Sequence, residues 1–259
     1  MHANFMGIMP QVIAKWSEDA GHEVQYFIFT GLEDLAEDAP KDVDMVFISA
    51  FTQSAIQAYA LSGKYRSEGV VTVLGGPHAR CYPEDAVKYF DYVLGITDEE
   101  LCRSVLKDCK QYRPVGVHLS AKSSPKHLPG VRERWKFISK ALEKTTRLFK
   151  VVPMIGSLGC PYTCSFCIDA NEPYQPLDFD ALKDDLRFVL TKIKRPLVSW
   201  YDPNFGVRFD DYMNAIEEAV PRNSIDFIAE SSLSLLSEPH LKRLRDNGFQ
   251  ALLPGIESW

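Results

Sequence analysis

The sequence predicts an α/β protein in two parts, a doubly wound, Rossmann-like parallel sheet followed by a partial (β/α) barrel. Apolar runs of strand length alternate with helix-like spacing in both halves of the 259-residue chain, which implies parallel strands joined by helices. Small or polar residues follow the ends of the strands, and a basic, Ser- and Pro-containing stretch separates the halves. We expect the first domain at 1–112, a linker at 113–150 and four barrel strands within 151–259.

The composition is that of an ordinary globular protein, with 46% hydrophobic and 25% charged residues. A formal net charge of -6 provides no basic field for nucleic acid, which we do not expect as a partner. No apolar run approaches the roughly 20 residues that span a bilayer, and the first residues lack a signal-peptide pattern. The scattered Cys81, Cys102 and Cys109 are typical of free thiols in a reducing compartment, so we expect a cytoplasmic protein.

Hydrophobic periodicity gives the elements of the first half. Residues 5–20 are expected to form a helix because Ile8, Val12 and Trp16 fall on one face, and Gly21 ends it. The other expected elements are strands at 23–29, 44–51, 70–74 and 92–95, helices at 54–66, 83–90 and 97–109, and a short strand within 112–120. The nearly all-apolar strand at 44–51 should be buried on both faces.

The second half is a regular βα repeat. Its expected elements are strands at 151–157, 197–201, 225–230 and 251–253, and helices at 177–194, 209–220 and 238–247. This pattern is typical of a (β/α) barrel, whose chemistry lies at the carboxyl ends of the strands. The basic stretch 132–149 is expected to be a solvated linker helix or a rim facing the other domain, rather than a nucleic-acid site.

One short loop, GSLGCPYTCSFCIDA, carries Cys160, Cys164 and Cys167. The nearest other Cys or His residues are His127 upstream and His240 downstream. A structural zinc site is normally closed by four protein ligands, and a ferredoxin cluster also takes four thiolates. Three thiolates without a fourth ligand therefore favour a 4Fe–4S cluster with one iron left open for a small molecule. Zinc remains the alternative.

This triad, with Phe166 before the last cysteine, resembles that of the radical S-adenosylmethionine (SAM) family. The resemblance implies that SAM chelates the open iron through its amino and carboxylate groups. It also implies that an electron from the cluster cleaves SAM to a 5′-deoxyadenosyl radical, which abstracts hydrogen from a small-molecule substrate. An electron donor such as flavodoxin or ferredoxin would be the partner.

The phrases ISAFTQS and GGPHA in the first half are similar to the cobalamin-binding domain of one large radical SAM class. Ligands of doubly wound sheets lie beyond the carboxyl ends of the strands. The candidate cobalamin contacts are therefore Ser49, Thr52, Gly75, Gly76 and His78. The Asp-x-His-x-x-Gly signature of many cobalamin proteins is absent, so His78 is either a cobalt or nucleotide-tail contact or a turn residue that bonds to backbone. The two glycines suit close approach to a ligand or a tight turn.

The same resemblance implies where SAM would bind in the barrel. Asp202 and Asn204 follow the second barrel strand, where the family contacts the SAM amino group. Glu230, Ser232 and Glu257 end the third and fourth strands, where it contacts the carboxylate and ribose. Two structural alternatives stay open, because Asp202 could start a Pro-Asn turn and Ser232 could cap a helix.

The sequence therefore predicts a radical SAM enzyme or a fragment of one. With cobalamin, methyl transfer to carbon is the commonest outcome in the class; without it, rearrangement or ring chemistry is the alternative. The alternative is a non-catalytic iron–sulfur or zinc protein, and nucleic-acid modification is the least supported. The family's first sheet opens with a strand and its barrel usually has six βα units, so the chain looks truncated at both ends. The sequence nominates neither a substrate nor a catalytic residue that acts on it.

Overall fold

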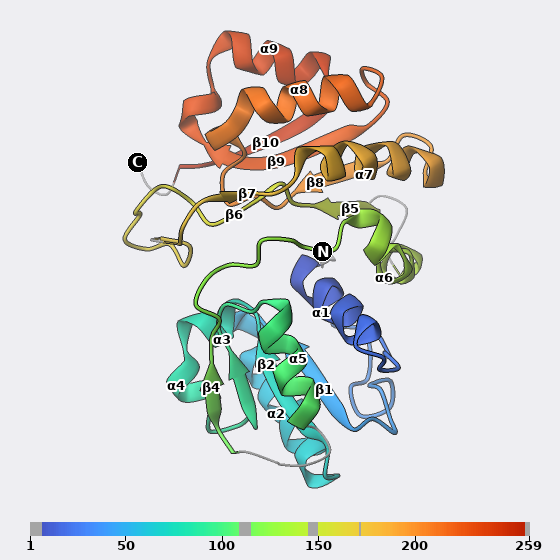
Figure 1. Ribbon diagram of the computed structural model, residues 1–259, viewed down its shortest axis with the longest axis vertical. Coiled ribbons are helices and arrows are strands. Elements are labelled where there is room, and N and C mark those ends of the chain that lie inside the picture. The colour runs from blue at the N-terminus through green and yellow to red at the C-terminus, as the bar shows by residue number, and fades with distance from the viewer. Residues whose placement is uncertain (1–6, 109–114, 145–149, 171, 257–259) are drawn as a thin grey trace. The chain divides into compact units, whose positions relative to one another are not determined.

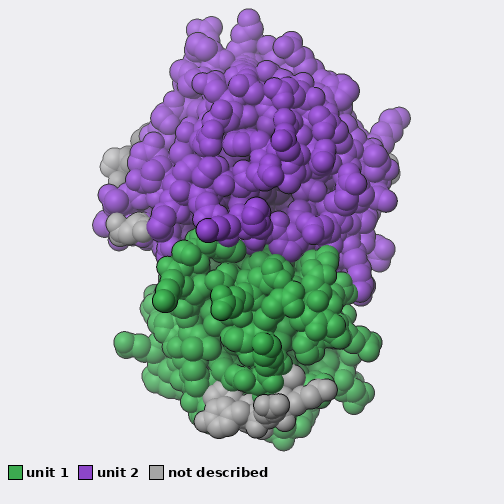
Figure 2. All heavy atoms as spheres, in the orientation of Figure 1, with its two compact units in different colours: residues 1–2, 9–125 green, residues 3–8, 126–259 purple. Residues whose placement is uncertain are grey.

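The computed structural model describes residues 7–108, 115–144, 150–170 and 172–256. The chain divides into two compact units, with the division between Pro125 and Lys126 (Figure 2). Each unit is organised around a four-stranded parallel sheet, which confirms the expected α/β class (Figure 1). No helix in these described ranges is long and apolar enough to cross a membrane.

Unit 1 has the strand order β1-β2-β3-β4, and every neighbouring pair is parallel. Its strands are β1 (Met45–Ser49), β2 (Val71–Gly75), β3 (Tyr92–Leu94) and β4 (Val117–Leu119). Its helices are α1 (Ile8–Asp19), α2 (Ala55–Ser67), α3 (Pro77–Cys81), α4 (Pro83–Ala86) and α5 (Glu99–Asp108). The central strands β2 and β3 are almost wholly buried, whereas the outer β1 and β4 are only partly covered.

Alternate residues of the central strands face two separate cores. Leu74 and Val93 pack with alanines of α2, α3 and α4 on one face of the sheet. Val73 and Tyr92 pack with Val105 of α5 on the other face. The sheet is therefore doubly wound, as the alternation of strands and helices predicted.

The expected first strand at 23–29 is wrong, because this segment forms no strand in the structure. It runs as partly exposed coil between α1 and β1, and Phe29 is 42% exposed. Among the described residues the sheet of unit 1 begins at β1, which pairs with β2 and not with this run. Its β propensity alone does not form a strand, because propensity depends on cross-strand packing.

Unit 2 has the strand order β10-β9-β8-β5, again all parallel, so successive strands are spatial neighbours. Its main strands are β5 (Val151–Met154), β8 (Leu197–Trp200), β9 (Asp226–Ser232) and β10 (Phe249–Gly255), with a short ladder of β6 (Ser157–Leu158) and β7 (Gln175–Pro176). Its helices are α6 (Val131–Lys144), α7 (Phe179–Lys192), α8 (Phe209–Ala219) and α9 (Glu238–Asp246). Helices α7, α8 and α9 lie on the same face of the sheet (Figure 1). This is the arrangement of consecutive barrel units.

Helix α6, from the basic stretch, has one buried face within unit 2, including Val131, Phe137 and Ile138. Its first turn is capped from α7, because the Asp185 carboxylate accepts the Val131 N–H at 2.6 Å and the Arg132 N–H at 2.9 Å. Such a cap satisfies N–H groups that have no partner inside the helix. Burial raises the pKa of Asp185, and the two N–H donors oppose that increase.

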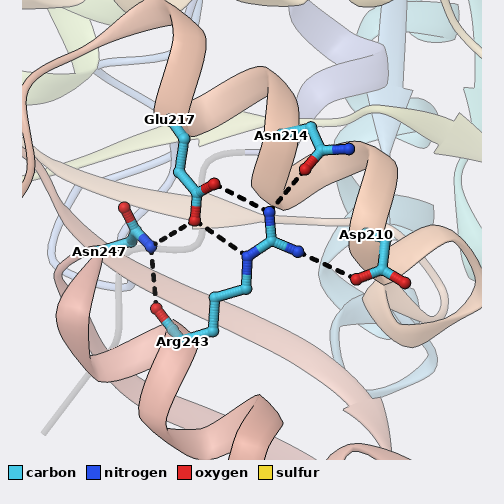
Figure 3. A network of polar contacts seen from close by, with 5 residues as sticks. All are labelled: Asp210, Asn214, Glu217, Arg243 and Asn247. Carbon is cyan, nitrogen blue, oxygen red and sulfur yellow. Dashed lines mark hydrogen bonds and ion pairs between the residues drawn. The ribbon is translucent and has the colours of Figure 1, made fainter.

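Two further contacts join the elements of unit 2. Under the helices, the ring of Tyr212 stacks on Phe205 at 4.9 Å and lies 5.5 Å from Trp200, between ring centroids. On the surface, Arg243 of α9 bonds to Glu217 through two nitrogens, at 2.9 Å each, and to Asp210 at 2.9 Å (Figure 3). Arg243 thereby ties α9 to α8.

Candidate functional site

The cysteine loop leaves the carboxyl end of β5 and is closed at its base. Strands β6 and β7 pair in antiparallel fashion, and the Leu177 N–H donates to the Gly156 carbonyl at 2.8 Å. Gly159 has a φ of +68°, and a Cβ there would lie 2.3 Å from the Pro173 carbonyl oxygen. The Cys160 N–H donates to the Glu172 carbonyl at 3.3 Å. The chain therefore enters and leaves the loop at one point, and the cysteines lie beyond it.

The three cysteines of the loop are free thiols. Cys164 is exposed, while Cys160 and Cys167 are partly exposed. A turn joins the last two, because the Cys167 N–H donates to the Cys164 carbonyl at 3.0 Å. The Asp169 N–H points at Cys167 Sγ, at 3.4 Å. Backbone N–H groups of this kind are among the hydrogen bonds that tune the sulfurs of iron–sulfur clusters.

These thiols fit a cluster by their chemistry and accessibility. Thiolates are the ligands that iron–sulfur clusters take, and a single loop supplies all three here. Among the residues that the structure describes, no three His, Cys, Asp or Glu side chains are grouped closely enough to hold a single metal ion. In a 4Fe–4S cluster each thiolate binds a different iron, so the three need not converge on one point.

Asp202, which follows β8, lies fully buried under the opening of this loop. Its Oδ2 accepts the Gly156 N–H at 2.9 Å, and its Oδ1 accepts the hydroxyls of Ser157 and Tyr212, each at 2.6 Å. Burial raises the pKa of Asp202, and the three donors oppose the increase. Burial, reinforced by the neighbouring Asp202 charge, raises the pKa of Tyr212. A contact between Asp202 and the SAM amino group would require these bonds to rearrange, and this role stays a prediction.

The other predicted SAM contacts lie at adjacent strand ends. Asn204 is buried, and its Oδ1 accepts the Gly206 N–H at 2.9 Å and the Ser231 hydroxyl at 3.2 Å. Ser232 ends β9, and its hydroxyl lies 2.7 Å from that of Ser234. Glu230 is exposed on the same strand, and Glu257 lies outside the described residues.

Two ionisable side chains, those of Tyr201 and Glu230, lie near these strand ends. Burial, followed by the charge of Glu230, raises the pKa of Tyr201 to about 12. Desolvation by the surrounding protein raises the pKa of Glu230. Tyr201 follows β8 and Glu230 lies on the adjacent β9, so both belong to the same rim of the sheet.

In unit 1 the predicted cobalamin contacts gather at the ends of β1 and β2, where Ser49 and Gly75 are register partners. Gly76 has a φ of +89°, and a Cβ there would lie 2.7 Å from Ser49 Oγ. A Cβ on Gly75 would meet no atom within 4 Å. Gly76 is thus explained by the close approach of the two loops, whereas Gly75 leaves space that a ligand can fill.

His78 is buried in the short helix α3, with both ring nitrogens close to hydroxyls. Its Nε2 lies 2.6 Å from the Tyr59 hydroxyl and its Nδ1 lies 3.3 Å from Thr52 Oγ1. Tyr59 donates its hydroxyl proton to Asp85 at 2.9 Å, so His78 Nε2 is the donor to Tyr59. The backbone N–H of His78 donates to the Ala50 carbonyl at 3.0 Å. A bond from His78 to cobalt would have to replace one of the ring contacts.

Burial, with the hydrogen bond to Asp85 second, raises the pKa of Tyr59 to about 12. The bond from Lys88 and then that from Tyr59 lower the pKa of Asp85. Sequence reasoning missed Tyr59, Tyr212 and Ser157, because each meets its partner only through folding. The one sequence signal was the position of Ser157 at the start of the cysteine loop, three residues before Cys160.

Comparisons with known proteins give a family for part of the chain and relatives for most of it. Residues 7–106 match the family described as the B12 binding domain. Bacteriochlorophyllide d C-8(2)-methyltransferase of Chlorobaculum tepidum is 27% identical over 233 residues, which are 84% of this chain and 50% of that protein. Bacteriochlorophyllide d C-12(1)-methyltransferase of the same organism is 22% identical over 251 residues, 90% of this chain and 54% of that protein. The chain thus spans about half the length of these curated relatives.

Among solved structures, the chain is similar to TsrM from Kitasatospora setae, a radical SAM methyltransferase determined with cobalamin and a 4Fe–4S cluster bound. The TM-score is 0.63 at 15% identity, over 97% of this chain and 56% of that one. At this identity the likeness shows the fold.

Proposed function

We propose that this chain is a member of the radical SAM superfamily, in the class with an N-terminal cobalamin-binding-like domain, and that it functions in methyl transfer to carbon. The observation that carries the proposal is the cysteine loop, with three free thiols beyond a closed base at the end of β5. The match of residues 7–106 to the B12 binding domain family supports the second cofactor. Both curated relatives are named as methyltransferases, which supports the reaction class.

In this proposal each group of residues has one task. Cys160, Cys164 and Cys167 hold a 4Fe–4S cluster, which when bound supplies the electron that cleaves SAM. Glu230 and Ser232, at the end of β9, are proposed to contact SAM on the same rim as the loop. The cradle around Gly75 in unit 1 is proposed to receive cobalamin. The substrate is proposed to be a small molecule.

We further propose that a flavodoxin or ferredoxin supplies the electron, because reductive cleavage of SAM needs a one-electron donor. A reducing compartment, the cytoplasm, suits a protein whose described cysteines are all free thiols.

The test is anaerobic reconstitution with iron and sulfide, followed by metal, acid-labile sulfide and corrinoid analysis. The wild-type chain should take up iron and sulfide in equal amounts, and Cys164→Ala should lose most of both. Cys81→Ala is the matched control, because Cys81 is also an exposed free thiol but lies in unit 1. Under dithionite, added SAM should give 5′-deoxyadenosine. Zinc as the sole bound metal, or equal losses in both variants, would contradict the cluster proposal; no retained corrinoid would contradict the cobalamin proposal.

A further inference from the structure

We propose that Asp202 is a positioning residue, which fixes the cysteine loop to the end of β8 and so sets where the cluster lies on the rim of the sheet. Its partners are Gly156, Ser157 and Tyr212, and these four residues are called the Asp202 clamp. The inference rests on the proposed function only in that the positioned group is an iron–sulfur cluster. The clamp itself is a property of the folded chain.

The geometry of the clamp is that of a buried anion with a full set of donors. Asp202, Ser157 and Tyr212 have no solvent exposure. Three donors converge on the carboxylate, a backbone N–H at 2.9 Å and two hydroxyls at 2.6 Å each. An ionised carboxylate only accepts hydrogen bonds, so it suits three donors, and short charge-assisted bonds are about twice as strong as neutral ones. Replacing this acceptor would leave buried donors without a partner, which is costly.

The clamp acts on the loop because Gly156 and Ser157 are where the loop begins. The Gly156 N–H bonds to Asp202, while its carbonyl accepts the Leu177 N–H at the loop's exit. Ser157 is paired with Pro176 in the β6–β7 ladder. Asp202 therefore holds the outgoing strand of the loop directly, and the returning strand is attached to it through the Gly156 carbonyl and the β6–β7 ladder.

The clamp also packs against the aromatic core of unit 2. A Cβ on Gly156 would lie 2.5 Å from the Tyr212 ring, so the backbone of the loop rests directly on that ring. Tyr212 in turn is stacked on Phe205 and lies against Trp200 and Phe179. The rigid core of unit 2 is thereby connected to the loop through Asp202 and Tyr212. Within the cysteine tip, the bond from the Cys167 N–H to the Cys164 carbonyl closes a local turn.

Three variants remove the clamp in different ways. Asp202→Asn keeps the shape of the side chain but replaces one carboxylate oxygen with an amide N–H₂. That N–H₂ then faces one of the hydrogen-bond donors of the clamp, so one hydrogen bond becomes a donor–donor contact. Ser157→Ala and Tyr212→Phe each remove one donor and leave the carboxylate bonded to the others. Tyr65→Phe is the matched control, because Tyr65 is also buried and donates to the Pro40 carbonyl at 2.6 Å, but lies in unit 1.

The first readout is hydrogen exchange of the cluster-free chain, measured at the Gly156 and Leu177 amides, which donate to Asp202 and to the Gly156 carbonyl. We expect Asp202→Asn to raise the exchange rate of these amides about 10- to 100-fold. At 1.4 kcal/mol per factor of ten, this corresponds to a decrease of about 1.4–2.8 kcal/mol in the free energy of local opening. Ser157→Ala and Tyr212→Phe should raise it by about 3- to 10-fold, and Tyr65→Phe should leave it unchanged. Unchanged exchange in all three clamp variants would overturn the inference, whether or not a cluster binds.

The second readout is the reconstituted chain, where loss of the cluster to an iron chelator is timed and the electron paramagnetic resonance spectrum is recorded. If Asp202 positions the loop, the clamp variants should lose the cluster faster than the wild type and show shifted g-values. Tyr65→Phe should show neither change, even where it lowers the free energy of unfolding as much as a clamp variant does. Wild-type behaviour of the cluster in Ser157→Ala and Tyr212→Phe would overturn the positioning role. If Asp202→Asn does not fold, these two variants decide the matter. Absence of any cluster in the wild-type chain would instead refute the proposed function and leave the exchange result standing.

Discussion

Substitution of Gly159 by alanine tests the closed base of the cysteine loop. Gly159 has a φ of +68°, a conformation that costs other residues about 1–2 kcal/mol. The new Cβ would lie 2.3 Å from the Pro173 carbonyl and 2.8 Å from that of Glu172, so this backbone must retreat by about 1 Å to ordinary contact. That movement breaks the bond from Cys160 to Glu172, which is worth about 1 kcal/mol.

Alanine at position 159 also lowers the conformational entropy of the unfolded chain, which adds about 0.4–1 kcal/mol to the free energy of unfolding. The net expectation is a loop base destabilised by about 2 kcal/mol, or about 30-fold in its opening equilibrium. The assay is hydrogen exchange of the Cys160 amide, read by mass spectrometry on peptides that cover 156–177. Gly63→Ala is the control, because Gly63 lies within α2 with nothing within 4 Å of a Cβ, and there alanine should stabilise by about 0.5–1 kcal/mol. Equal protection of Cys160 in Gly159→Ala and wild type would refute the packed base.

Two further predictions concern the stability of unit 2. Arg243→Ala should cost about 1 kcal/mol at pH 7 in urea unfolding, since the network is partly exposed and screened (Figure 3). The hydrogen bond from Arg243 lowers the pKa of Glu217 from its ordinary 4.5, so this stabilisation is present above pH 4.5 and is lost as pH falls through the lowered pKa. The difference between wild type and Arg243→Ala should therefore shrink in acid. Asp185→Ala should cost about 1–2 kcal/mol, because the N–H groups of Val131 and Arg132 lose their acceptor.

Each of these has its own control. Asp184 is the exposed neighbour of Asp185 and pairs with Arg187 of the same helix, so Asp184→Ala should cost less than about 0.5 kcal/mol. Equal effects of Asp184→Ala and Asp185→Ala would show that Asp185 does not cap α6. A cost of Arg243→Ala that stays constant from pH 7 to pH 3 would show that Glu217 is not its charged partner.

Much of the fold could be predicted from sequence because strands and helices are periodic and local. The strands at 45–49, 71–75 and 226–232 were predicted in this way to within two residues at each end, as was the loop with the three cysteines. The strand predicted at 23–29 was wrong because a strand forms only beside a neighbouring strand. Hydrophobic periodicity does not indicate whether such a neighbour is present.

The interior of the site was less accessible to sequence reasoning. Asp202 was predicted at the rim from its position after a strand, yet its side chain turns inward to Ser157, 45 residues away. Tyr212 reaches it from a helix whose apolar face is indistinguishable in sequence from an ordinary core face. His78 and Tyr59 meet only because α2 and α3 pack on the same face of the sheet. Buried polar contacts of this kind depend on tertiary packing, which single-sequence patterns do not encode.

The central claim is that three thiolates hold a 4Fe–4S cluster with one iron open to SAM. The most direct measurement is the electron paramagnetic resonance spectrum of the reduced, reconstituted wild-type chain, recorded with and without SAM. We expect a reduced-cluster signal that requires Cys160, Cys164 and Cys167 and changes when SAM is added. A cluster signal that SAM leaves unaltered, or one that survives the loss of any of the three thiols, would contradict it.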